Sequence, residues 1–147
     1  MARILVVDDE TEIRDLIKDV LVVGGHSIET AANGAAALAL LRGKRYDVVI
    51  LDRNMPGISG IEVLAQLRRL PSCKGVKVMM CTASGTMGDV DDALSAGADD
   101  YLVKPLDLAL MQQKVTRLCP PPGAAPEPEP ETGGLKGLLR RILPPQS

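Results

Sequence analysis

Aromatic side chains are scarce in this sequence of 147 residues, which has two tyrosines and neither tryptophan nor phenylalanine. Single-stranded nucleic acids are commonly bound by stacking on aromatic rings, and aromatic cages bind quaternary ammonium groups. The sequence disfavours both kinds of site. It also lacks an excess of positive charge, because 17 basic residues stand against 19 acidic ones. We therefore expect no nucleic-acid partner, since such binding needs a basic docking surface.

Cysteine, histidine and long apolar runs are also rare. A single histidine, His26, and three cysteines without metal-ligand spacing, Cys73, Cys81 and Cys119, nearly exclude a zinc site. No segment approaches the roughly 20 apolar residues that cross a membrane, and the N-terminus does not resemble a signal peptide. We accordingly expect a cytoplasmic protein with reduced thiols.

The composition changes abruptly near residue 118. Regularly spaced apolar segments occupy residues 1–118, whereas residues 119–134 are dominated by proline, glycine, alanine and glutamate. Such a segment buries too little apolar surface to fold, and its prolines favour an extended chain. A short leucine-rich tail follows at residues 135–147. We therefore predict one domain, a Pro/Glu-rich linker and an extended or disordered tail.

Short β-branched runs alternate with helical patterns along the domain. Continuous apolar runs are typical of strands buried on both faces of a parallel sheet, and apolar residues three and four apart indicate helices. The predicted strands cover residues 3–7, 27–31, 47–51, 76–81 and 100–103, and the predicted helices cover residues 12–23, 35–41, 59–70, 90–96 and 106–118. This (βα)5 pattern predicts an α/β fold with a doubly wound, five-stranded parallel sheet.

Charged and hydroxyl side chains follow four of these strands. Asp8 and Asp9 end the first, Asp52 the third, Thr82 the fourth, and Lys104 follows the fifth. In such sheets the ligand site lies beyond the carboxyl ends of the strands, so these groups should converge there. Three neighbouring carboxylates repel one another, and a hard divalent cation with oxygen ligands compensates them. The sequence thus predicts a Mg²⁺ site.

Four segments carry a family resemblance. VVDDE, LDRNMPGISG, CTAS and YLVKP, in this order and spacing, resemble the receiver domain of two-component response regulators over about residues 1–118. The resemblance implies the flavodoxin-like strand order 2-1-3-4-5. It also implies that Asp52 accepts a phosphoryl group. The implied Mg²⁺ ligands are Asp9 directly, Asp8 through a water, Asp52, and the main-chain carbonyl of Asn54.

The same resemblance implies roles for residues near the phosphoryl site. Thr82 would bond the phosphoryl group, Lys104 would pair with one of its oxygens, and Tyr101 would be an aromatic switch. The peptide bond between Lys104 and Pro105 would be cis. Proline and glycine fix turns, so we expect the loop after Asp52 to be shaped by three further residues, namely Pro56, Gly57 and Gly60.

The tail carries an amphipathic pattern. On a helical wheel its apolar residues share one side and its basic residues lie outside that arc. The apolar residues are Leu135, Leu138, Leu139, Ile142 and Leu143, and the basic residues include Arg140 and Arg141. So short a helix is marginal alone. A partner-binding peptide and a disordered end both remain open, whereas membrane contact is disfavoured because no aromatic anchor is present.

The residues after position 118 are too few for a conventional output domain. We therefore expect a stand-alone response regulator, phosphorylated by a histidine kinase or phosphotransfer protein, whose output is contact with a protein effector or a phosphorylation-dependent homodimer. It would catalyse only its own modification and is not an enzyme acting on outside substrates. The alternative is an unphosphorylated scaffold that recruits partners through its tail. A hydrolase is disfavoured, because aspartate-nucleophile phosphatases generally place a carboxylate where this sequence has Asn54.

Overall fold

A computed structural model describes residues 2–83 and 85–120 of the chain. Its centre is a five-stranded parallel sheet in the order β2-β1-β3-β4-β5, which confirms the predicted architecture and strand order. The strands are β1 (Arg3–Val7), β2 (Ser27–Ala31), β3 (Val48–Asp52), β4 (Lys77–Thr82) and β5 (Asp100–Val103). The chain reverses direction across the sheet after β2, so β1 and β3 flank the point where ligand sites form in such folds.

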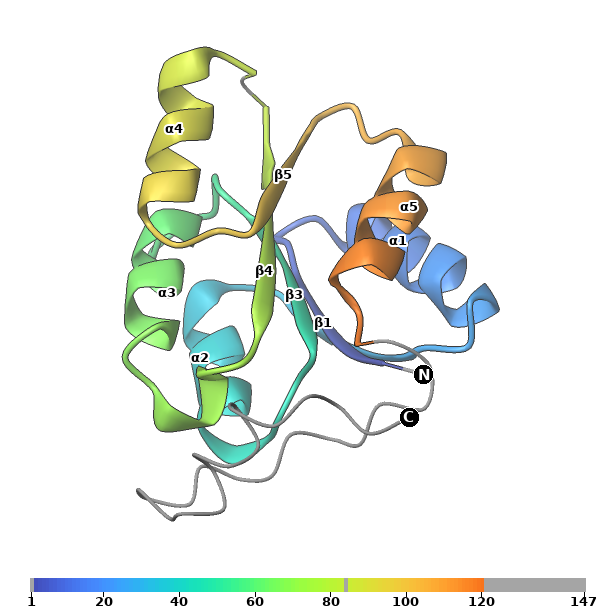
Figure 1. Cartoon of the computed structure of the whole chain (residues 1–147), viewed down its shortest axis with the longest axis horizontal. Coiled ribbons are helices and arrows are strands. Elements are labelled where there is room, and N and C mark those ends of the chain that lie inside the picture. Colours follow the sequence, from blue (N-terminus) through green and yellow to red (C-terminus); the bar gives the residue numbers. More distant parts are fainter. Residues whose placement is uncertain (1, 84, 121–147) are drawn as a thin grey trace, which may run out of the picture.

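Helices cover both faces of the sheet. α1 (Thr11–Val23) and α5 (Leu108–Leu118) lie on one face, and the other three helices lie on the opposite face (Figure 1). Those three are α2 (Gly34–Gly43), α3 (Gly60–Leu67) and α4 (Met87–Ser95), and a short 3-10 helix spans Pro71–Cys73. The helices α1 to α4 each lie between two parallel strands, which is the arrangement that right-handed crossovers produce, and α5 follows β5.

The sheet separates two apolar cores. Leu5 and Val49 belong to the core under α2 and α3, whereas Ile4 and Ile50 belong to the core under α1 and α5. Successive side chains of a strand point to opposite faces, so a strand covered on both sides must be apolar at every position. This explains the uninterrupted apolar runs in the sequence.

Several helix ends differ from the sequence predictions. The predicted helix over residues 59–70 stops at Leu67, and the chain then enters the 3-10 turn that starts at Pro71. Proline disfavours helical geometry in the residue before it, which explains an early stop. α4 begins at Met87 rather than at Val90, because the side chain of Thr86 accepts a hydrogen bond from the Asp89 N–H and caps the helix.

The predicted linker and tail lie almost entirely outside the described residues. α5 ends at Leu118, where the domain was predicted to end, and Cys119 continues with extended backbone angles. Over residues 2–83 and 85–120, no helix combines the length and the hydrophobicity that a membrane crossing requires. The tail residues that were predicted to contact a partner all belong to the part that the structure does not describe.

Candidate functional site

The ends of the sheet ladder hold the backbone of the site in place. The Asp8 N–H donates to the Ala31 carbonyl at 3.2 Å, and the Lys104 N–H donates to the Thr82 carbonyl at 2.7 Å. Directly after Asp52, the Arg53 N–H donates to the Cys81 carbonyl at 2.8 Å. Each functional segment therefore leaves the sheet from a hydrogen-bonded position, which gives its side chains a defined origin.

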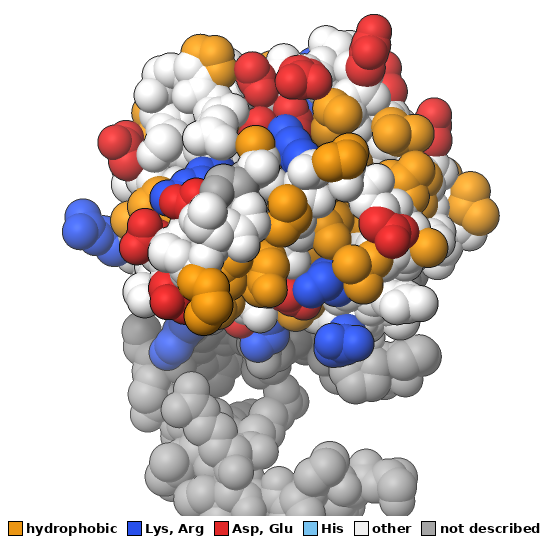
Figure 2. Space-filling view, turned by 90° about the horizontal axis from the view of Figure 1, so that it is seen from above, with side chains coloured by type: hydrophobic (Ala, Val, Ile, Leu, Met, Phe, Trp, Pro, Cys, Tyr) orange, Lys and Arg blue, Asp and Glu red, His pale blue; other side chains and the backbone are white. Residues whose placement is uncertain are grey.

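Three carboxylates meet at this edge of the sheet, as predicted. Asp8, Asp9 and Asp52 each place an oxygen within 4.8 Å of the others. Asp8 is 2% exposed and Asp52 is 3% exposed, whereas Asp9 reaches solvent. Figure 2 looks down on this edge, where a group of acidic side chains lies beside a basic one in the upper half of the view.

Lys104 is the cation that contacts the buried acids. Its Nζ lies 3.3 Å from Asp8 Oδ2 and 3.3 Å from Asp52 Oδ1. The other oxygen of Asp8, Oδ1, accepts the Glu10 N–H at 2.9 Å. One ammonium thus bridges two carboxylates from different strands, and the three-acid cluster keeps a net negative charge that a divalent cation would balance.

Burial acts on the pKa values of Asp52 and Lys104 in opposite directions. Burial, and secondly the charge of Asp8, raise the pKa of Asp52 to about 6, although Lys104 and the Asn54 N–H partly oppose this. Burial alone would lower the pKa of Lys104, but the two aspartates outweigh it and the pKa is raised. Lys104 therefore stays charged near neutral pH, while Asp52 loses its proton less readily than an ordinary aspartate.

The oxygen-rich donor set suits a hard divalent cation such as Mg²⁺ better than a softer ion. Its groups are carboxylates, with solvent access through Asp9, so a small hard ion could keep several waters. A groove of about 490 Å³ adjoins Asp9 between the loops after β2 and β3. Asn54 lies in the second of these loops, and its N–H donates to Asp52 Oδ1 at 3.2 Å. The predicted carbonyl ligand therefore belongs to a residue whose backbone contacts Asp52.

Thr82 and Pro105 lie close to the cluster, whereas Tyr101 is further along the sheet. Thr82 is buried at the end of β4, and the bond between Lys104 and Pro105 is cis. Tyr101 lies earlier on β5, half-buried, with the Lys114 Nζ 5.2 Å from its ring centre. The structure thus brings together the acids, Thr82 and Lys104, and places Tyr101 at the surface beside α5.

Two glycines of the loop after β3 are constrained in different ways, Gly60 by the space around it and Gly57 by its backbone angle. A Cβ on Gly60 would come within 2.7 Å of the Arg53 Cα and would also strike the Asp52 carbonyl. Gly57 has a φ of 81°, which side-chain-bearing residues rarely adopt. Pro56 and Gly57 also line the groove beside Asp9. The predicted shaping role of these residues has a steric basis at both glycines.

Two arginines near the site make contacts that the sequence did not indicate. Arg14 Nη1 donates to the Asp8 carbonyl at 2.7 Å from the first turns of α1. Arg53 Nη1 donates to the Asp89 carbonyl at 2.8 Å, which joins the loop after β3 to α4. The sequence marks Arg53 only by its place after Asp52, since the direction of its side chain depends on how α4 packs.

Residues 4–116 match the family model described as the response regulator receiver domain. This chain belongs to that family. Membership supports a part in two-component signalling. In this receiver Asp8, Asp9 and Asp52 lie together, and Lys104 contacts Asp8 and Asp52.

Known receivers resemble the chain in sequence. It is 45% identical over 106 residues to the transcriptional regulatory protein TcrA of Mycobacterium tuberculosis, which covers 72% of this chain and 41% of TcrA. The chain thus matches less than half of that relative's length. The chemotaxis protein CheY-3 of Vibrio cholerae is 33% identical over 117 residues, which covers 79% of this chain and 90% of CheY-3.

Solved receiver structures share the fold. The chemotaxis response regulator CheY4 of Vibrio cholerae superposes with a TM-score of 0.77 at 33% identity, over 80% of this chain and 98% of CheY4. The response regulator TrrA of Thermotoga maritima, in complex with Mg²⁺ and beryllium fluoride, gives a TM-score of 0.71 at 42% identity. That match covers 80% of this chain and 99% of TrrA. The acidic cluster of this receiver is consistent with Mg²⁺ binding.

Proposed function

We propose that this receiver is phosphorylated on Asp52 by the phosphohistidine of a sensor kinase or phosphotransfer protein. The observation that carries the proposal is the position of the Asp52 carboxylate, which is buried against Lys104 and shares a cluster with Asp8 and Asp9. A scaffold that is never phosphorylated would have no need to keep three repelling acids around one lysine. This arrangement favours phosphorylation over the scaffold alternative.

The chemistry is an in-line transfer. A carboxylate oxygen of Asp52 forms a bond to phosphorus while the bond between phosphorus and the histidine nitrogen breaks, and that nitrogen keeps the electron pair. The Lys104 ammonium, 3.3 Å from Asp52 Oδ1, would pair with a phosphoryl oxygen. Asp9, Asp8, Asp52 and the Asn54 carbonyl would hold Mg²⁺. When bound, Mg²⁺ supplies positive charge to the phosphoryl oxygens.

We infer that the output is contact with a protein effector in the cytoplasm. TcrA is named as a transcriptional regulator, but its match covers only the receiver part, and CheY-3 matches over nearly its whole length. Exposed apolar side chains on α4 and α5, namely Met87, Leu94 and Leu110, are available for contact with a partner. The near-neutral charge supports a protein partner over DNA. A homodimer through the same surface is a second arrangement to test.

The test is labelling with a small phosphodonor in the presence of Mg²⁺, followed by mass spectrometry. We expect one phosphoryl adduct on the native chain and none on Asp52→Asn, because an amide is not a competent nucleophile for acyl phosphate formation. Asp15→Asn, an exposed position on α1, is the matched control and should be labelled normally. An adduct of full occupancy on Asp52→Asn would refute the assignment.

A further inference from the structure

Packing holds α4 weakly. Of its nine residues, all of them described, Ala93 is the one buried side chain. Met87 at its start is 78% exposed, and Leu94 near its end is also exposed. Few apolar contacts and an exposed surface mark an element whose local stability is low. The position of α4 therefore depends strongly on polar contacts with residues outside the helix.

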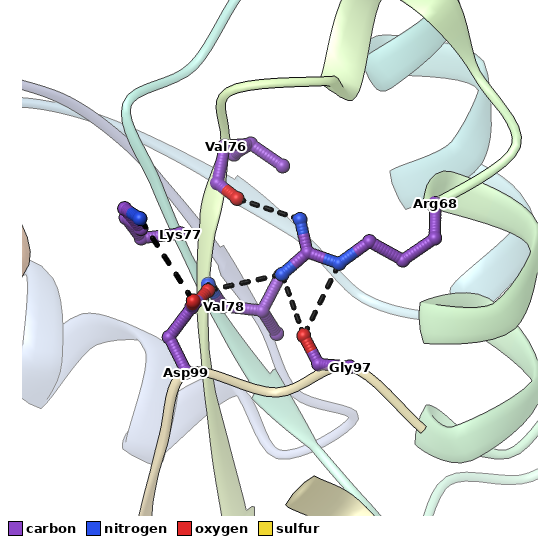
Figure 3. A network of polar contacts seen from close by, with 6 residues as sticks. All are labelled: Arg68, Val76, Lys77, Val78, Gly97 and Asp99. Atoms are coloured by element: carbon purple, nitrogen blue, oxygen red, sulfur yellow. Dashed lines mark hydrogen bonds and ion pairs between the residues drawn. The ribbon is translucent and has the colours of Figure 1, made fainter. Parts of the chain in front are cut away.

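One arginine holds the carboxyl end of α4. The Arg68 guanidinium donates to the Gly97 carbonyl from Nε at 3.1 Å and from Nη2 at 2.6 Å, and to the Val76 carbonyl from Nη1 at 2.7 Å (Figure 3). Nη2 also pairs with Asp99 Oδ2 at 2.9 Å, and that oxygen accepts the Val78 N–H at 2.8 Å. This end of α4 is thus tied to β4 at the edge of the sheet opposite the acids.

A second arginine holds the amino half of α4, and it is the residue directly after Asp52. Arg53 Nη1 donates to the Asp89 carbonyl at 2.8 Å, while Nη2 lies 3.4 Å from Asp89 Oδ1 and 3.6 Å from Asp92 Oδ2. The Arg53 side chain is 19% exposed, so these contacts are partly shielded from solvent.

The backbone of Arg53 cannot follow α4. Its N–H donates to the Cys81 carbonyl, and its carbonyl accepts the Gly60 N–H at 2.8 Å. Any shift of α4 away from the loop after β3 must therefore stretch the contacts between the Arg53 guanidinium and the two aspartates. Only the side chain can adjust.

We propose that Arg53 is a latch that couples the state of Asp52 to the position of α4, with the end held by Arg68 as the pivot. The inference rests on the phosphorylation of Asp52 proposed above. A phosphoryl group adds negative charge and strong hydrogen-bond acceptors beside Thr82. Thr82 ends β4 and Thr86, four residues later, caps α4, so we expect a change at Thr82 to reach the start of α4.

The latch favours the arrangement of α4 without a phosphoryl group. By linkage, a ligand that prefers the released arrangement must work against these contacts, and their removal should strengthen its binding. A purely structural arginine would instead lower stability without changing the affinity. An arginine that bound the phosphoryl group itself would weaken binding on removal. The sign of the change therefore separates the three roles.

The experiment is a calorimetric titration of the full chain with beryllium fluoride and Mg²⁺, as a stable phosphoryl mimic, for native protein, Arg53→Gln and Arg68→Gln. We expect Arg53→Gln to bind the mimic about fivefold more tightly. This is the change in affinity expected when the lost ion pair had stabilised the unliganded arrangement at the upper end of the range for surface pairs. Arg68→Gln, the matched control at the far end of α4, should lose stability but keep its affinity within about twofold. Equal or weaker binding by Arg53→Gln, or an equal gain in Arg68→Gln, would overturn the latch.

Asp92→Asn provides a second variant on the α4 side, at an exposed position where folding is not at risk. It should also tighten binding of the mimic, and the double variant with Arg53→Gln should gain less than the two single changes together. Full additivity would argue against the latch. If the native chain itself fails to bind the mimic, the phosphorylation proposal fails, whereas binding without any effect of Arg53→Gln defeats the latch alone.

Discussion

At the scale of single residues, the proposed phosphoryl transfer depends on one buried carboxylate. Asp52 is 3% exposed, and its charge is tolerated because Lys104 and the Asn54 N–H contact the same oxygen. Burial and Asp8 nevertheless raise the pKa of Asp52 to about 6. Such a group lowers stability when it is charged, so the metal-free protein carries an unfavourable charge that Mg²⁺ would offset.

The contribution of Asp52 should therefore make the metal-free protein less stable as the pH rises through about 6. The folded state holds this proton more tightly than the unfolded chain, so the contribution is complete below the ordinary aspartate range and is lost above the raised pKa. The expected size is on the order of 3 kcal/mol, because each pKa unit corresponds to about 1.4 kcal/mol. Urea unfolding in EDTA across this range measures it.

Asp52→Asn should remove that pH dependence and stabilise the metal-free protein at neutral pH, whereas Asp15→Asn should leave the dependence intact. An Asp52→Asn profile that still falls through about pH 6 would show that another group is responsible.

Asp9 is the exposed member of the acid cluster, and its removal should separate metal binding from folding. Asp9→Ala is expected to abolish the stabilisation by Mg²⁺ and to raise the melting temperature in EDTA by about 2–4 °C, because repulsion with Asp8 and Asp52 is relieved. Thermal melts with Mg²⁺ and with EDTA test both statements. A variant clearly less stable in EDTA would mean that Asp9 is compensated by contacts other than metal.

At the scale of elements, the start of α3 lies so close to the backbone at the end of β3 that no side chain fits between them. α3 begins at Gly60, directly against the carbonyl of Asp52 and the Cα of Arg53. The Ser59 side chain caps the helix by accepting the Glu62 N–H at 3.3 Å. The start of α3 thus packs directly against the backbone of Asp52 and Arg53.

Gly60→Ala should cost about 2 kcal/mol or more of stability and impair labelling of Asp52, because its Cβ has no space beside that backbone. Gly43→Ala is the matched control, since a Cβ there meets nothing within 4 Å. It should be neutral or stabilising by about 0.5–1 kcal/mol, as expected for glycine to alanine in a helix. Chemical unfolding of both variants tests the contrast, and equal stabilities would contradict it.

At the scale of the whole molecule, the receiver encloses its two cores within residues 2–120, and the Pro/Glu-rich segment follows it. From its composition we expect this segment to be a tether that transmits no rigid conformational signal. We therefore expect that removal of residues 121–147 leaves Mg²⁺ and beryllium fluoride affinity unchanged within about twofold, and the melting temperature within about 2 °C. Calorimetry and thermal melts of the two chains decide this. A clear loss of affinity would show that the tail contacts the switching part.

The sequence alone determined the alternation of strands and helices, and it placed acidic, hydroxyl and basic residues at the ends of four strands. Fully apolar strands require cover on both faces, and parallel strands bring their carboxyl ends to one edge, so Asp8, Asp52, Thr82 and Lys104 had to meet. These features follow from the spacing of apolar residues and from the alternation of strands and helices, and both can be read along the chain.

Only the tertiary structure decided where α3 ends, where α4 begins, and what the arginines contact. Helix ends depend on capping side chains such as Thr86, and several neighbouring residues can often serve as the cap with similar free energy. Arg53 and Arg68 bind groups far along the chain, at Asp89 and at Gly97. A long flexible side chain acquires its direction from the packing of distant elements, and no local pattern in the sequence encodes that direction.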